Sequence, residues 1–151
     1  MRAPLNIDLL SDKLTALATL QTRHVDAAKG YEEAAKRDEG EIAAVCQSLA
    51  ELHNEQAETL SRILIANGGE PDADGSWLSL VHRSVLTVRD WADRLDQDML
   101  NGFIDGEKRI LEQFDTVLDQ TGWSDDERRQ LVAQRDRIEA EIGRLRWMSG
   151  E

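Results

Sequence analysis

Six polar residues lie on the apolar stripes of the long helical segments, where they could bind a metal ion or form a hydrogen-bonded core. Apolar residues recur at three- and four-residue steps along each segment, so these polar residues share the inward face of a helix. Two histidines with one carboxylate form a known zinc ligand set, whereas arginine stays protonated and only donates hydrogen bonds. The six residues are Gln21, His24, His53, Gln56, Glu107 and Arg135.

The turn between the first two helical segments decides which of these residues meet. A turn near Asp38 places His24 opposite His53, and it places Gln21 opposite Gln56. Antiparallel neighbours joined by such a short turn keep this register along their length. We therefore expect the four side chains to form one polar layer near the middle of the bundle.

A second turn, near Gly122, brings the other two polar residues into the same layer. It places Glu107 within about half a helical turn of Arg135. A buried carboxylate needs a partner, and the arginine supplies one. We expect Glu107 and Arg135 to form a buried ion pair, with the histidines and glutamines satisfying one another.

The polar layer must be positioned by helices, because the amino-acid composition disfavours β-strands. Aromatic residues make up 5% of the chain, and Leu, Ala, Glu, Arg and Gln dominate it. Residues 67–69 suit a left-handed helix end, and Ser124 with Glu127 forms a capping box. Asp38 with Glu41 gives a similar helix start. The predicted helices cover residues 8–36, 41–66, 77–93, 96–119 and 125–147.

The lengths of the connections predict the topology. About four residues join the helices within the first pair and within the last pair, so each pair is antiparallel. Residues 68–94 form a far longer connection, which can return from one end of the bundle to the other. We predict one all-α domain over residues 1–151, a ferritin-like four-helix bundle of two antiparallel helix pairs with an additional crossover helix between them.

Charge and cysteine content exclude several classes of function. The net charge of −12 provides no basic face for nucleic acid or for an anionic membrane surface. The first ten residues lack the apolar stretch of a secretory signal. The single cysteine, Cys46, lies on an apolar helical stretch and excludes an intrachain disulfide. We expect a small buried core residue there, and a reducing cytoplasm as the compartment.

Several short motifs follow one another along roughly residues 10–147. They lie at residues 29–35 (KGYEEAA), 49–51 (LAE), 69–71 (GEP), 75–78 (GSWL), 81–83 (VHR) and 106–107 (GE). With these motifs the chain looks like a member of the ferritin-like superfamily, which includes rubrerythrins. It is more closely similar to an uncharacterised bacterial ferritin-like family, a domain of unknown function.

The resemblance implies a place for metal ligands. Metal-binding relatives use one Glu on each of two helices and Glu-x-x-His on each of the other two. The position of the first lone Glu corresponds to His24 in this chain. The first Glu-x-x-His corresponds to residues 53–56, so His53 stands at the Glu position and Gln56 at the His position. The second lone Glu falls on Glu107, which matches, and the last Glu-x-x-His falls on residues 135–138.

One carboxylate beside an arginine cannot balance the four positive charges of two divalent metals. We therefore expect no cofactor and no bound metal. Two alternatives stay open. The first is a mononuclear zinc site on His24, His53 and Glu107. The second is a residual di-iron, ferroxidase-like centre that recruits other carboxylates, such as Glu33, Glu55 or Asp136.

Tryptophan gives the clearest prediction about partners. Trp77 and Trp91 share one edge of the predicted crossover helix, and tryptophan is enriched at interface hot spots. We expect a homodimer that associates through this edge, because isologous dimers are the commonest oligomers. No pattern identifies another protein partner.

No nucleophile with an adjacent base and no glycine-rich phosphate loop can be identified in the sequence. We therefore expect no catalytic residue and no enzymatic activity. The favoured function is a scaffold or interaction protein, and the resemblance implies a role in bacterial stress physiology. The alternative function is a metalloprotein with one of the two centres described above.

Overall fold

The computed structural model describes residues 3–69 and 95–150, with side chains from residue 12 to 69 and from 99 to 150. These residues form only helices: α1 (Ala3–Arg37), α2 (Glu41–Ala66), α4 (Leu95–Asp119) and α5 (Asp125–Ser149). The predicted all-α class is confirmed, and three of the expected helices have nearly the expected bounds. The predicted crossover helix over residues 77–93, with Trp77 and Trp91, lies outside the described residues.

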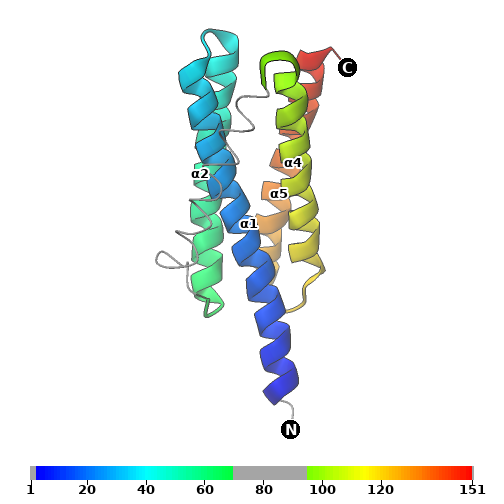
Figure 1. Cartoon of the computed structure of the whole chain (residues 1–151). Coiled ribbons are helices and arrows are strands. Elements are labelled where there is room, and N and C mark those ends of the chain that lie inside the picture. Colours follow the sequence, from blue (N-terminus) through cyan, green and yellow to red (C-terminus); the bar gives the residue numbers. More distant parts are fainter. Residues whose placement is uncertain (1–2, 70–94, 151) are drawn as a thin grey trace.

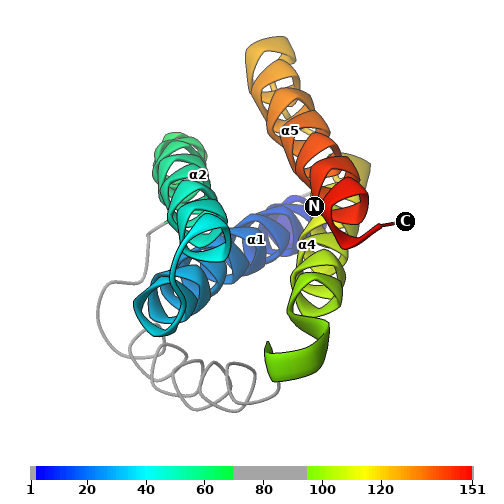
Figure 2. The same ribbon diagram turned by 90° about the horizontal axis from the view of Figure 1, so that it is seen from above.

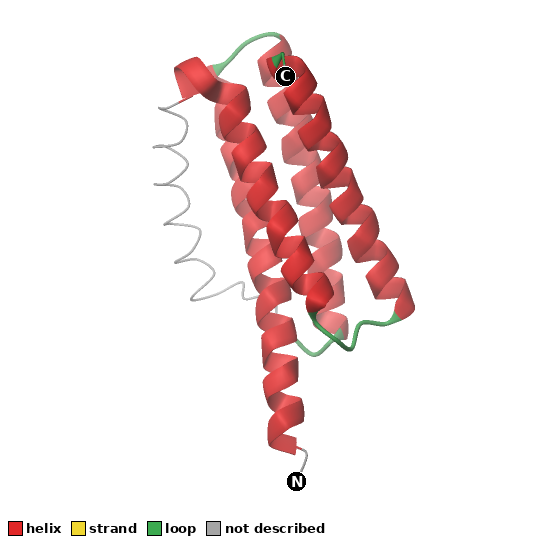
Figure 3. Ribbon diagram, turned by 90° about the vertical axis from the view of Figure 1, so that its right-hand side faces the viewer, coloured by secondary structure: helices red, strands yellow, loops and turns green. Residues whose placement is uncertain are grey.

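The first helix begins earlier than the apolar stripe predicts. It starts at Ala3 rather than near residue 8, and Pro4 is acceptable there because the amide nitrogens of a first turn have no intrahelical partner. This N-terminal part of α1 extends beyond the other helices (Figure 3).

Two antiparallel helix pairs build the bundle. The helices α1 and α2 form one pair, α4 and α5 form the other, and α1 also packs against α4. The end of α2 and the start of α4 lie at opposite ends of the bundle, so these two helices run in the same direction (Figure 1). Seen from above, α1 lies between α2 and α4, and α2 and α5 stand further apart (Figure 2).

Apolar residues from all four helices make one core. The largest fully buried apolar side chains include two aromatics of α4, Phe103 and Phe114. Cys46 is fully buried as expected, and burial raises the pKa of its thiol to about 11. None of the described helices is long and apolar enough to cross a membrane. The other largest fully buried apolar side chains are Leu17, Leu20, Leu49, Leu60, Leu64, Leu131, Ile138 and Leu145.

The helix ends follow the predicted signals with one exception. Ser124 Oγ accepts a hydrogen bond from the Glu127 backbone N–H at 3.0 Å, and the Glu127 carboxylate accepts one from the Ser124 N–H at 2.9 Å. Gly68 has the predicted left-handed conformation after α2, with φ of 84°. The predicted capping box at Asp38 is wrong. Gly40, with φ of 72°, precedes α2 instead and no side chain caps it.

A buried lysine joins three elements at one end of the bundle. Lys13 Nζ of α1 donates to Asn67 Oδ1 at 2.6 Å and to the Gly122 carbonyl oxygen at 2.7 Å. The same nitrogen lies 4.3 Å from the centroid of the Trp123 ring. Asn67 in turn donates to the Glu127 carboxylate at 2.7 Å. Lys13 therefore ties α1 to the end of α2 and to the turn between α4 and α5.

Replacing Lys13 with methionine should lower the free energy of unfolding by about 1–3 kcal/mol, because two partly buried hydrogen bonds between distant elements are lost. Urea denaturation monitored by circular dichroism measures the change. Lys36→Met is the matched control, since the Lys36 side chain is 73% exposed and its loss should cost at most about 0.5 kcal/mol. Equal effects of the two substitutions would contradict the role given to Lys13.

Candidate functional site

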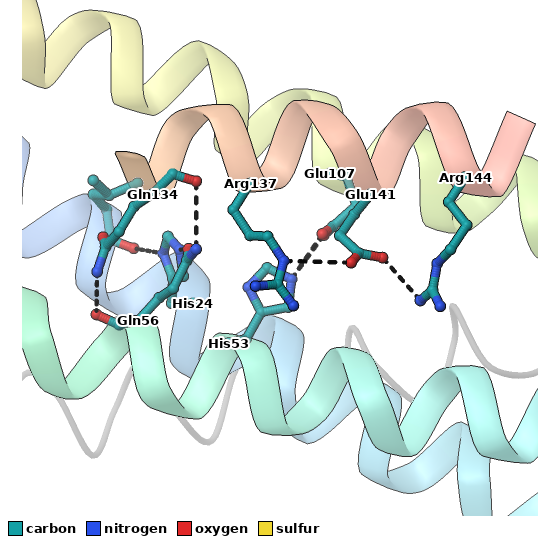
Figure 4. A network of polar contacts seen from close by, with 9 residues as sticks. His24, His53, Gln56, Glu107, Gln134, Arg137, Glu141 and Arg144 are labelled. Atoms are coloured by element: carbon teal, nitrogen blue, oxygen red, sulfur yellow. Dashed lines mark hydrogen bonds and ion pairs between the residues drawn. The ribbon is translucent and has the colours of Figure 1, made fainter. Parts of the chain in front are cut away.

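Four of the six polar residues singled out in the sequence lie together in the bundle interior. His24 of α1, His53 and Gln56 of α2, and Glu107 of α4 are all buried, and we call these four the polar core site. Figure 4 shows them beside α5. Gln21 is only partly buried. The turn-based register therefore placed the α1 and α2 histidines correctly.

The centre of the site is a direct contact between His53 and Glu107. The His53 Nε2–H points between both carboxylate oxygens of Glu107, at 2.8 and 2.9 Å. Both side chains are essentially excluded from solvent, with exposed fractions of 0% and 1%. A carboxylate this deeply buried is stable only with a partner, and His53 is that partner.

Tyr31 adds a second contact to the same carboxylate. Its ring stacks on His53 with centroids 5.7 Å apart and planes 10° apart. Burial raises the pKa of the Tyr31 hydroxyl well above its ordinary value, and the negative charge of Glu107 raises it further, together with a hydrogen bond to that carboxylate. The hydroxyl therefore keeps its proton and donates a hydrogen bond to the Glu107 carboxylate.

His24 is held as a neutral ring. Its Nδ1 lies 2.9 Å from the Leu20 carbonyl oxygen and its Nε2 lies 2.7 Å from Gln56 Oε1. Both oxygens are acceptors, so the neutral ring donates its single N–H to one of them at a time. Burial lowers the pKa of His24 to about 3, and the neighbouring His53 lowers it as well. The centroids of the two histidine rings are 5.1 Å apart. Both nitrogens of His24 are thus engaged by protein groups.

The glutamines connect the site to α5. Gln56 Nε2 donates to the Gln134 backbone carbonyl oxygen at 3.3 Å, and Gln134 Nε2 donates back to the Gln56 carbonyl oxygen at 3.4 Å. This reciprocal pair bridges α2 and α5, the two helices that stand apart in Figure 2.

The predicted ion pair between Glu107 and Arg135 is wrong. Arg135 Nε contacts Asp115 at 2.7 Å and its guanidinium contacts Glu139 at 3.1 Å, on the outside of the bundle. The acceptor Asp115 raises the pKa of Arg135. Gln134, which precedes Arg135 in α5, reaches Gln56 of the site, whereas the Arg135 side chain is directed to the surface carboxylates.

Two partly buried residues of α5, Gln134 and Glu141, lie beside the site, and the exposed Arg137 lies with them and pairs with Glu141 at 3.6 Å (Figure 4). Glu141 is close enough to Tyr31 to raise its pKa, and it pairs with Arg144 at 2.8 Å. Sequence reasoning missed both residues, although they lie four residues before and three after Ile138, which is fully buried. That helical spacing was the available signal.

The site does not fit a di-metal centre. Glu107 is the only carboxylate among its four residues, and it is already hydrogen-bonded by His53. No group of three or more His, Cys, Asp or Glu side chains is arranged to hold a metal ion in the described part of the chain. Of the ring nitrogens of His24 and His53, only His53 Nδ1 has no hydrogen-bond partner among the described residues.

Comparison with known proteins gives one match. Residues 12–120 match the family model described as "Domain of unknown function (DUF2383)". The match covers α1 from its third turn onward, α2 and α4, and it ends before α5. No curated protein and no solved structure matches the chain.

Proposed function

The chain belongs to the family described as Domain of unknown function (DUF2383), and we propose that it acts without catalysis, as a metal-free helical scaffold or interaction protein. The observation that carries this proposal is the closed pairing of His53 with both oxygens of Glu107. Glu107 and His53 Nε2 satisfy each other, which leaves, of these two side chains, only His53 Nδ1 without a partner among the described residues. A buried polar network that is hydrogen-bonded in this way specifies one packing of the helices.

The proposal includes a ferritin-like arrangement of the four helices. It also places the protein in the reducing cytoplasm. The helix arrangement is supported by the parallel course of α2 and α4, which begin at the same end of the bundle, and by the two antiparallel pairs (Figure 1). The single buried cysteine agrees with a reducing compartment. The role in stress physiology rests on the family resemblance.

A mononuclear metal site on His24, His53 and Glu107 is the second candidate. It is favoured by the free nitrogen His53 Nδ1 and by the short distance between the two histidine rings. Forming it would require His24 to give up its contacts with Leu20 and Gln56, and Glu107 to give up its contact with His53. The loss of these buried hydrogen bonds opposes metal binding.

Metal titration tests the proposal. Added Zn²⁺, or Fe²⁺ under anaerobic conditions, should leave the unfolding midpoint of the wild-type protein unchanged, since only a ligand of the folded state raises it. A metal present at about 100 times its Kd would stabilise the fold by about 2.7 kcal/mol, which is readily measured.

Glu107→Gln is the matched control for the titration, because it keeps the side-chain size while weakening any ligand set. It should respond to metal as the wild type does. A stabilising shift in the wild type that disappears in Glu107→Gln would overturn the metal-free proposal and favour the metalloprotein.

A further inference from the structure

The outer side of α5 exposes large apolar side chains. Of the three large hydrophobic side chains exposed among the described residues, two lie on α5, Trp147 at 79% and Val132 at 39%. Trp147 follows the fully buried Ile138 by nine residues, which is about two and a half helical turns. It therefore points directly away from the core. Packing within the bundle does not explain this residue, whereas tryptophan is enriched at interface hot spots.

Small residues continue the same side of the helix. Ala133, Ala140 and Trp147 are exposed and follow one another at intervals of seven residues, so they form one row along α5. Gly143 is exposed beside this row, and a Cβ atom added there would meet nothing within 4 Å. We call Val132, Ala133, Ala140, Gly143 and Trp147 the outer α5 face. No other described helix lies against this side of α5 (Figure 2).

The distribution of charge favours a second copy of this chain as the occupant of the outer α5 face. Carboxylates outnumber basic residues by three in α2 and by five in α4, whereas the two numbers are equal in α5. They are also equal in α1, but α1 lies between α2 and α4 (Figure 2). Two copies, each with a net charge of −12, repel each other least where α5 meets α5. A basic partner would instead be attracted to α2 or α4.

We propose that two copies of this chain form a symmetric dimer in which their outer α5 faces pack antiparallel, with Ala140 on the twofold axis. Residues equally far before and after Ala140 then lie opposite each other. Trp147 of each copy covers Ala133 of the other, because both are seven residues from Ala140. The alanine leaves the space that the indole ring fills. This inference rests on the proposed function as an interaction protein and names its partner.

The charged residues beside the face agree with the antiparallel register. Asp136 and Arg144 are exposed, and they lie four residues before and four residues after Ala140. Asp136 of one copy therefore comes opposite Arg144 of the other. Arg144 also contacts Glu141 of its own helix through Nη2 at 2.8 Å, and its five N–H donors suffice for both carboxylates. A parallel pairing would set each of these charges against its own copy, where like charges repel.

The contact is small, so the dimer is weak. The outer α5 face extends over about 22 Å of helix, and one such helix pair buries less than the about 800 Å² per partner of a standard interface. Sedimentation velocity of the wild type should show an average mass that rises from 17.0 kDa toward twice that value between about 10 µM and 1 mM. A wild type that stays monomeric, or that grows beyond a dimer, would overturn the proposal.

A charge exchange on the twofold axis is the decisive experiment. Ala140→Glu sets two carboxylates against each other and Ala140→Lys sets two ammonium groups against each other, so each variant alone should stay monomeric. The equimolar mixture should form a 1:1 heterodimer, because the glutamate of one copy meets the lysine of the other. Glutamate and lysine are good helix formers, so both variants should keep the wild-type circular dichroism spectrum. A mixture that does not associate would contradict the register.

Ala44→Glu is the matched control, since Ala44 is exposed on α2, away from the outer α5 face, and this variant should dimerise as the wild type does. Trp147→Ala should weaken the dimer at least about tenfold, because both indole rings are lost from the contact. Association that persists unchanged in Ala140→Glu would overturn the proposal and would favour the edge of Trp77 and Trp91. None of these results depends on metal, so the titration above tests the proposed function separately.

Discussion

Replacing Glu107 with leucine should lower the free energy of unfolding by about 3–5 kcal/mol. Leucine fills most of the space but accepts no hydrogen bond. His53 Nε2 and the Tyr31 hydroxyl would then lose their acceptor inside the core. Urea denaturation at neutral pH, followed by far-ultraviolet circular dichroism, measures the effect.

Arg135→Leu is the matched control for this substitution. Arg135 binds two exposed carboxylates, Asp115 and Glu139, and such surface pairs contribute at most about 1 kcal/mol. A small loss in Glu107→Leu would contradict the pairing seen in the structure. Large losses in both variants would favour the ion pair expected from the sequence.

His24 should make the protein sensitive to acid. Its pKa is about 3 in the folded protein, lowered from 6.5 by burial and then by His53. Between these two pH values the unfolded chain binds a proton that the folded protein excludes, so stability falls as the pH drops from 6.5 toward 3. The slope is about 1.4 kcal/mol per pH unit, which amounts to a loss of about 2.7 kcal/mol at pH 4.5.

His24→Phe isolates this contribution, because phenylalanine packs in the same apolar surroundings beside Phe114 and cannot titrate. Free energies of unfolding of both proteins are measured from pH 7.5 to pH 4.5. The difference between the two profiles should shrink with falling pH by about 2.7 kcal/mol. Parallel profiles would mean that His24 keeps its ordinary pKa in the folded protein.

The helices, and the site residues on α1 and α2, could be predicted from the sequence because they follow from the spacing of apolar residues. The α1–α2 turn is short, and its position fixes the register of both helices. His24, His53 and Gln56 therefore fell into one layer by counting residues. The buried position of Glu107 likewise follows from its place on the stripe of Phe103, Ile110 and Phe114.

The partners within the layer were not accessible in the same way. Counting residues across the second turn placed Arg135 beside Gln134, which does reach the site, but counting could not show that the Arg135 side chain points to the surface. Charge complementarity then favoured arginine as the partner of Glu107. A histidine from a different helix pair satisfies the carboxylate instead, and helix-to-helix distances of this kind are not encoded in a periodic pattern.

The buried lysine and the helix start at Gly40 show the same limit. Lys13 belongs to no recognisable sequence motif, so nothing in the sequence indicates that it is buried. Its two acceptors, Asn67 and Gly122, lie in turns that are distant in the sequence. Asp38 and Glu41 have the residue types of a capping box, but the left-handed Gly40 lies between them and turns the chain. Local sequence preferences indicate where a helix could begin, but the packing of the whole chain determines where it does begin.

The most direct test of the account is the coupling energy between His53 and Glu107, since the metal-free function depends on that pair. The cycle compares the wild type, His53→Phe, Glu107→Leu and the double variant, with phenylalanine retaining the stack on Tyr31. We predict a coupling of about 2 kcal/mol or more, with the double variant more stable than Glu107→Leu alone. Losses that add within about 0.5 kcal/mol would contradict the pair and the scaffold built on it.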